Sequence, residues 1–184
     1  MKLNTLLITM CGLAASLSAG NAMADWTTTQ EAPYVAIDYS RFTYKDAGSN
    51  ASMPSAAVRV GSVVLPHLAI EMQAGASFKD GTISVPGATY NFNLHEFAGV
   101  YLRPQVALGP VTGYVLAGFD YQNIKYHTGN NAATPTSGTQ ENTSGSYGAG
   151  ASLTLHANYD VSADYMHYGD GLTAVSVGLV YHIN

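Results

Sequence analysis

Residues 172–183 read Leu-Thr-Ala-Val-Ser-Val-Gly-Leu-Val-Tyr-His-Ile, and this alternation decides the fold. One face of such a strand carries large apolar side chains: Val175, Val177, Leu179, Tyr181 and Ile183. The opposite face carries small or polar ones: Ala174, Ser176, Gly178 and His182. Because side chains alternate across a β-strand, this strand separates two environments. We expect lipid on the apolar side and a packed polar interior on the other.

The first 24 residues are typical of a cleavable signal peptide. Lys2 supplies the positive charge, residues 6–15 form the apolar segment, and Ala22-Met-Ala24 is the small-x-small cleavage site. We therefore expect residues 25–184 to be the mature chain and to form one domain. This part of the sequence contains no cysteine, which excludes disulfides and thiolate chemistry.

The composition argues against a water-soluble domain and against nucleic acid as a partner. Charged residues make up 10% of the chain, whereas soluble domains usually have about 25%. The 47% of hydrophobic residues are dispersed, and after residue 24 they form no apolar run of about 20 residues, the length of a spanning helix. The formal net charge of −5 disfavours binding to phosphate backbones.

Alternation with a period of two predicts eight strands, at residues 34–42, 56–64, 68–78, 94–103, 112–122, 146–155, 159–168 and 172–183. Short connections at 65–67, 104–111 and 156–158 alternate with longer ones at 43–55, 79–93 and 123–145 and with the brief 169–171. Short turns at one end and long loops at the other are typical of outer-membrane barrels. We predict an all-β fold, an eight-stranded antiparallel up-and-down transmembrane β-barrel with both termini in the periplasm.

The aromatic residues support this orientation. Those on the outward face near the long loops are Tyr39, Phe78, Phe119, Tyr121, Tyr147 and Tyr165, while Tyr181 lies near the opposite end. Such a distribution is typical of two interfacial girdles. The alternative is a soluble β-sandwich or lipocalin-like barrel, but its wet face would need charges where this chain has mostly Gly, Ser, Ala and Thr.

Six charged residues fall on the inward face: Asp38, Arg59, Glu71, Arg103, Asp120 and Asp164. Charges at membrane depth need partners or water inside the protein. We therefore expect Arg59 and Arg103 to pair with some of the carboxylates, with Glu71 and Asp164 holding the network. We interpret the network as a structural plug, and a gated path for protons or ions is the alternative.

Four parts of the chain resemble the OmpA-like and opacity-type outer-membrane β-barrel superfamily: residues 34–41, 58–61 with 68–71, 99–103 and 114–118. The resemblance implies an eight-stranded, monomeric barrel in the outer membrane of a Gram-negative cell, in contact with lipid and lipopolysaccharide. It implies no single activity, because such barrels serve as adhesins, serum-resistance factors, anchors and enzymes. Two departures from the family are the non-aromatic C-terminal residue, Asn184, and the absence of a peptidoglycan-binding domain after the barrel.

Three histidines near the expected rim, His95, His127 and His167, are candidates for a metal site or a general base. They lack close ligand spacing, and the His-x-Ser pair of eight-stranded lipid A deacylases does not occur in this chain. We expect no enzyme, no metal and no cofactor. A lipid-modifying enzyme and a narrow channel are the alternatives, since wide pores belong to barrels of about 16 strands.

The longest predicted loop, residues 123–145, is rich in Asn, Thr, Ser and Gly. Long loops on a rigid barrel are where recognition can be placed. We expect a structural or surface-binding role, in adhesion to a host or extracellular ligand or in resistance. The alternative for this loop is a disordered segment that shields the surface.

Overall fold

The computed structural model describes residues 33–46, 49–65, 67–85, 88–128, 136–169 and 171–183. The predicted signal peptide, residues 1–24, lies outside them. The described residues form nine strands: β1 (Tyr34–Asp46), β2 (Ser49–Leu65), β3 (Leu68–Ser77), β4 (Gly81–Val85), β5 (Ala88–Leu108), β6 (Val111–Thr128), β7 (Ser137–His156), β8 (Tyr159–His167) and β9 (Leu172–His182). Among these residues there is no helix of the length and hydropathy that crossing a membrane requires.

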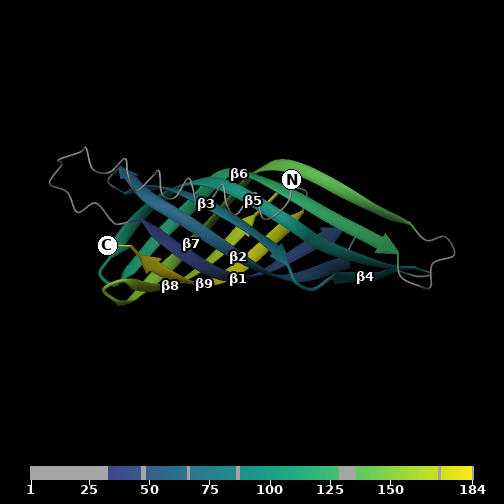
Figure 1. Cartoon of the computed structure of the whole chain (residues 1–184), viewed down its shortest axis with the longest axis horizontal. Helices are drawn as coiled ribbons and strands as arrows, with labels where there is room; N and C mark the ends of the chain where they lie inside the picture. The colour runs from purple at the N-terminus through teal and green to yellow at the C-terminus, as the bar shows by residue number, and fades with distance from the viewer. Residues whose placement is uncertain are drawn as a thin grey trace.

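The strands form one antiparallel sheet that closes on itself (Figure 1). The order is β3-β2-β1-β9-β8-β7-β6-β5-β4, and β3 also pairs with β5. Eight strands thus complete the ring, and β4 continues the line of β3 along β5, from Gly75↔Phe97 to Gly81↔Phe92. The predicted eight-stranded up-and-down barrel is confirmed, with β4 as an addition.

The three segments predicted as long loops are largely strand. Residues 43–55 belong to β1 and β2, residues 79–93 to β4 and β5, and residues 123–145 to β6 and β7, apart from the connections between these strands. Their inward apolar side chains, such as Met53 and Ile83 (0% and 7% exposed), are few among Asn, Thr, Ser, Gly and Tyr, so hydrophobic periodicity is weak in these segments. Strand pairing needs only backbone donors and acceptors, which every such residue has.

The short-turn end is tighter than predicted. Residues 104–111 are strand except for Gly109 and Pro110, and Gly109 has a φ of 65°, a left-handed conformation that glycine adopts at little cost. Tyr34 pairs with His182 at this end, so the first and last strands begin and finish there. Figure 1 shows the end of β9 on the side of these turns, and the hairpins β4–β5 and β6–β7 at the opposite end, called here the hairpin end.

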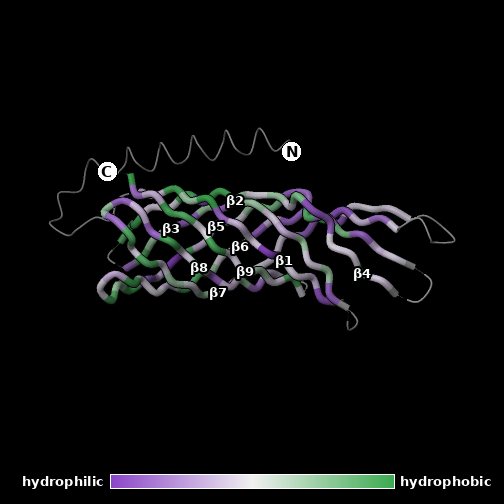
Figure 2. The backbone as a smooth tube through the Cα atoms, turned by 90° about the horizontal axis from the view of Figure 1, so that it is seen from below, coloured by the Kyte–Doolittle hydropathy of each residue, from purple (hydrophilic) through white to green (hydrophobic). Residues whose placement is uncertain are grey.

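The polarity of the barrel is the reverse of that in a soluble protein. Large apolar side chains face outward, among them Ile37 (71% exposed), Phe119 (72%) and Leu179 (52%). Buried side chains include many polar and charged ones, such as Asp38 and Glu71, each 1% exposed. Figure 2 shows the hydrophobic residues concentrated along the barrel and paler or hydrophilic ones along the projecting hairpins. An apolar outer surface around a polar interior is the arrangement that a bilayer requires.

Exposed aromatic rings lie near both rims of the apolar surface. Those toward the hairpin end are Tyr39, Phe78, Phe119, Tyr147 and Tyr165. At the short-turn end Tyr159 and Tyr181 form a pair with ring centroids 5.2 Å apart. Tyr121, predicted to be outward, is half-buried. These rings are placed as interfacial girdles are, with an apolar band between them.

Replacing Val177 with arginine tests the lipid-facing surface. Val177 is 51% exposed and lies near the middle of β9. We expect the V177R variant to lose about 2–4 kcal/mol of its free energy of unfolding in lipid vesicles, because the charge enters the hydrocarbon. T139R, on the part of β7 that extends beyond β8, should be close to neutral. Equal stability of the two variants in urea titrations would contradict the assignment.

Candidate functional site

Arg59 of β2 lies inside the barrel and contacts three carboxylates. Its Nε donates to Asp38 Oδ2 at 2.8 Å and its Nη2 to Oδ1 at 2.7 Å, a bidentate pair with the neighbouring strand β1. Its Nη1 lies 3.3 Å from Asp164 and 3.5 Å from Glu71. All four side chains are at most 5% exposed. Because burial removes water from these ions, each depends on the others for compensation.

Arg103 of β5 extends the network. Its Nη1 lies 3.3 Å from Glu71 Oε2 and donates to the Tyr34 hydroxyl at 2.6 Å, and that hydroxyl donates to Glu71 at 2.7 Å. The guanidinium carbon lies 3.9 Å from the centroid of the Tyr114 ring, a cation–π contact. Glu71 therefore links the two arginines across strands β2, β3 and β5.

Asp120 lies outside this network. Its carboxylate accepts hydrogen bonds from the Gln122 amide and from Ser144 Oγ, the latter at 3.3 Å. It is further along β6 than Tyr114, toward the hairpin end. The structure thus brings Asp38, Arg59, Glu71, Arg103 and Asp164 together and leaves Asp120 with neutral partners.

Glycines on the inward face make room for these large side chains. A Cβ on Gly61 would overlap the Tyr34 ring, and a Cβ on Gly178 would overlap the Asp38 carboxylate. An interior of about eight strands is only wide enough for side chains to fill it. The small inward Gly and Ser residues therefore leave the space that the buried Tyr and Arg side chains occupy.

The interior is layered along the barrel axis. At the short-turn end a cavity of about 240 Å³ reaches up to Tyr34 and Arg103, and at its mouth His182 Nε2 lies 3.0 Å from Asp160 Oδ2. On the hairpin side of the network an apolar cluster fills the barrel. Within it, the ring of Phe42 packs against those of Phe97 and Tyr168, with centroids 4.8 and 5.2 Å apart.

The three candidate histidines lie in different surroundings. His127 Nε2 is 3.3 Å from the amide nitrogen of Asn91, the His167 ring lies 5.1 Å from that of Tyr147, and His95 is exposed. Within the described ranges, no three His, Cys, Asp or Glu side chains are grouped so that they could hold a metal ion.

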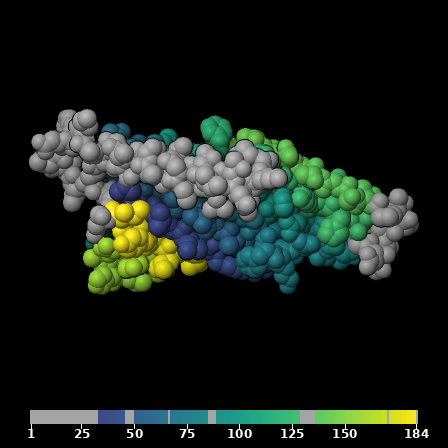
Figure 3. Space-filling view, viewed as in Figure 1, coloured from purple at the N-terminus to yellow at the C-terminus, as the bar shows by residue number. Residues whose placement is uncertain are grey.

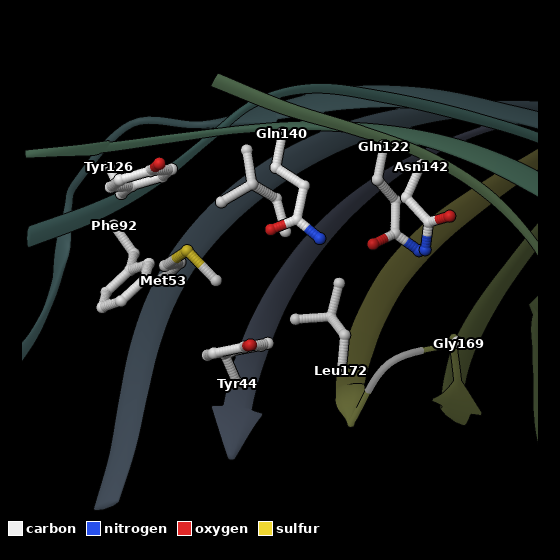
Figure 4. Close-up of a pocket in the computed structure, with 10 residues that line it drawn as sticks. Tyr44, Met53, Phe92, Gln122, Tyr126, Gln140, Asn142, Gly169 and Leu172 are labelled. Atoms are coloured by element: carbon white, nitrogen blue, oxygen red, sulfur yellow. The ribbon is translucent and has the colours of Figure 1, made fainter. Parts of the chain in front are cut away.

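A second hollow opens at the hairpin end, above the apolar cluster (Figure 4). Its lining combines aromatic rings, carboxamides and aliphatic groups: Tyr44, Phe92, Tyr126, Gln122, Gln140, Asn142, Met53, Ile124, Gly169 and Leu172. Sequence reasoning placed most of these residues in or beside loops and did not propose the site. The alternation of Gln122, Ile124 and Tyr126 on one face was the signal that could have found it.

Comparison with known proteins supports the same architecture. Residues 10–182 match the family of the outer membrane protein beta-barrel domain. Among solved structures, Ail, the attachment invasion locus protein of Yersinia pestis, in complex with the heparin analogue sucrose octasulfate, is 17% identical, with a TM-score of 0.59 over 84% of this chain and 99% of Ail. None of the curated proteins matches this chain.

Two further structures are similar to a comparable degree. The N-terminal β-barrel domain of Pseudomonas aeruginosa OprF is 15% identical, with a TM-score of 0.59 over 84% of this chain and all (100%) of that domain. Neisserial surface protein A is 15% identical, with a TM-score of 0.54 over 82% of this chain and 97% of that protein. At these identities the likeness concerns the fold alone.

Removing Arg59 tests the charge network. We expect the Arg59→Met variant to lose about 3–5 kcal/mol of its free energy of unfolding, because three buried carboxylates lose their shared cation. Arg41→Met is the matched control, since Arg41 is exposed and donates only to Ser52 at 2.7 Å; its loss should stay below about 1 kcal/mol. Urea unfolding in vesicles measures both, and equal losses would refute a special role for the network.

Proposed function

The chain belongs to the family of outer membrane proteins with a β-barrel domain, and from this premise we propose that it binds extracellular ligands through strands that project from the barrel. The observation that carries the proposal is strand length. A membrane-spanning strand needs about 9–11 residues, and β8 and β9 have 9 and 11. Strands β5, β6 and β7 have 21, 18 and 20. About half of each of these three strands is therefore surplus to crossing the membrane.

The surplus residues of β6 and β7 form a defined structure, here called the projecting ribbon. It consists of residues 121–128 of β6 and 137–143 of β7. The two segments pair in continuous register from Tyr121↔Thr143 to His127↔Ser137. β7 pairs with β8 only from Tyr147 onward, so the ribbon stands beyond the short β8–β9 hairpin. At about 3.3 Å per residue, residues 137–146 of β7 extend roughly 30 Å past that point. Figure 3 shows β6 and β7, in green, at this end of the molecule.

The chemistry of the ribbon supports recognition rather than passive shielding. Its outward residues are Asn, Thr and Ser together with Tyr121, His127 and single charges at Lys125 and Glu141, and paired strands hold such side chains in fixed positions. Polar groups on a rigid scaffold are suited to binding a partner specifically. The crystal structure of Ail with a heparin analogue is an example of a ligand on a barrel of this fold.

The remaining features are proposed to serve stability and placement. The short turns and both termini of the chain face the periplasm, and the long hairpins face outward. The charge network acts as a structural plug, which the apolar cluster of Phe42 and its neighbours supports. The barrel works as a monomer in contact with lipid and lipopolysaccharide, without a cofactor and without catalytic activity.

Shortening the ribbon tests the proposed function. Deleting residues 125–139 and joining Ile124 to Gln140, which are paired neighbours, through an Asn-Gly turn keeps the strand register. We expect the variant to insert and to show the heat-dependent electrophoretic shift of a folded barrel. Its adhesion to host cells or its protection against serum should be lost, because the recognition surface is gone.

The control for this experiment is V106T, a mild change on the lipid-facing surface, where Val106 is 51% exposed. V106T cells should adhere and survive in serum as the parent does. If the shortened barrel folds and both phenotypes persist unchanged, the projecting ribbon is not the binding surface.

A further inference from the structure

We propose that the hollow at the hairpin end binds a neutral oligosaccharide. The inference rests on the proposed function and names the class of ligand that this end of the barrel recognises. It follows from three properties of the lining residues: the aromatic rings, the carboxamides and the lack of charge.

The aromatic rings offer flat apolar faces at the rim. Tyr44 of β1 and Phe92 of β5 pack against one another on one side of the hollow, with ring centroids 5.6 Å apart and planes tilted by 36° (Figure 4). Tyr126 comes from β6, and a Cβ on Gly138 of the neighbouring strand would overlap its ring. Gly138 therefore lets the Tyr126 ring lie against the β7 backbone. The electron-rich face of an aromatic ring attracts partly positive hydrogens, such as those of the C–H groups on one face of a sugar.

The carboxamides supply the polar half of such a site. Figure 4 shows Gln122 and Asn142 directed toward one another on one side of the hollow, with Gln140 beside them. Gln140 is exposed, whereas Gln122 is 2% exposed and donates to Asp120. Gln122 is thus held in place by an interior residue, while Gln140 can reach a ligand. A carboxamide both donates and accepts, which matches the dual character of a sugar hydroxyl.

The charge of the hollow selects a neutral ligand. Among the described residues, no Asp, Glu, Lys or Arg lines it. Lys45, Lys125 and Glu141 alternate with lining residues and therefore belong to the outer face of their strands. The inward carboxylate of Asp120 is 2% exposed and accepts a hydrogen bond from the lining residue Gln122. A sulfated or phosphorylated ligand would therefore find no cation in the lining.

The size of the hollow sets how a ligand would lie. Its volume is about 30 Å³, which is room for about two water molecules. An oligosaccharide would therefore lie across the rim, with its rings over Tyr44, Phe92 and Tyr126, rather than be engulfed. A shallow site of this kind binds a single sugar weakly, and its affinity rises when several linked sugars bind together.

The test is binding of the full, folded chain in detergent micelles to an array of uncharged oligosaccharides, with heparin oligosaccharides as the anionic comparison. The best uncharged ligand is then titrated calorimetrically. We expect Tyr126→Ala and Gln140→Ala each to raise its Kd by about tenfold. Tyr165→Ala, on the lipid-facing surface where Tyr165 is 52% exposed, should leave Kd unchanged.

Three results would overturn the proposal: no uncharged oligosaccharide binds, heparin binds more tightly, or Tyr126→Ala and Gln140→Ala bind as the parent does. The heat-dependent shift on electrophoresis shows that each variant is folded. Adhesion separates this proposal from the proposed function. If shortening the ribbon abolishes adhesion while the two point variants retain it, only the saccharide site is wrong; if the shortened barrel still adheres, the binding role itself fails.

Discussion

The pairing of β3 with β5, from Leu68↔Pro104 to Gly75↔Phe97, turns an open sheet into a ring. In hydrocarbon every backbone donor and acceptor needs a partner within the protein, and a closed set of strands meets that requirement on both sides of each strand. Closure also fixes which side chains point inward, because alternation along each strand cannot slip without exposing polar groups to lipid. The polarity of the two faces follows from this closure, to which the pairing of β1 with β9 contributes equally.

A closed ring of eight strands in turn constrains what can fill it. Several large inward side chains lie against a glycine on the neighbouring strand, as Tyr34 does against Gly61. Most of the buried charges at mid-barrel form a connected set, in which Arg59 contacts three carboxylates and Glu71 contacts two arginines. The apolar cluster around Phe42 fills the rest of the barrel interior, so the barrel is a rigid support for the projecting ribbon.

Period-two alternation predicted the barrel and the inward face of Asp38, Arg59 and Glu71, because lipid outside and a polar interior make the two faces chemically distinct. In the outer parts of β6 and β7 polar residues occur on both faces, so the alternation loses its contrast, and β4 has only five residues. For the same reason the hollow lined by Tyr126 and Gln140 was not foreseen. Nor could sequence alone assign Asp120 to Gln122 and Ser144 rather than to an arginine, since partners across the barrel depend on strand register.

The register between β1 and β9 has a consequence for assembly. These strands pair from Tyr34↔His182 to Tyr44↔Leu172, so the barrel seam joins the first strand of the described chain to the last. A partial chain that stops before β9 cannot close the barrel. Pairing of β1 with β9 joins residues far apart in sequence, so it is slow compared with the formation of hairpins between neighbouring strands. The polypeptide therefore reaches the membrane complete and still open along its seam. Before closure β1 and β9 are unpaired edge strands, which favour aggregation. They are also the surfaces that an insertion machinery can bind until the two strands pair.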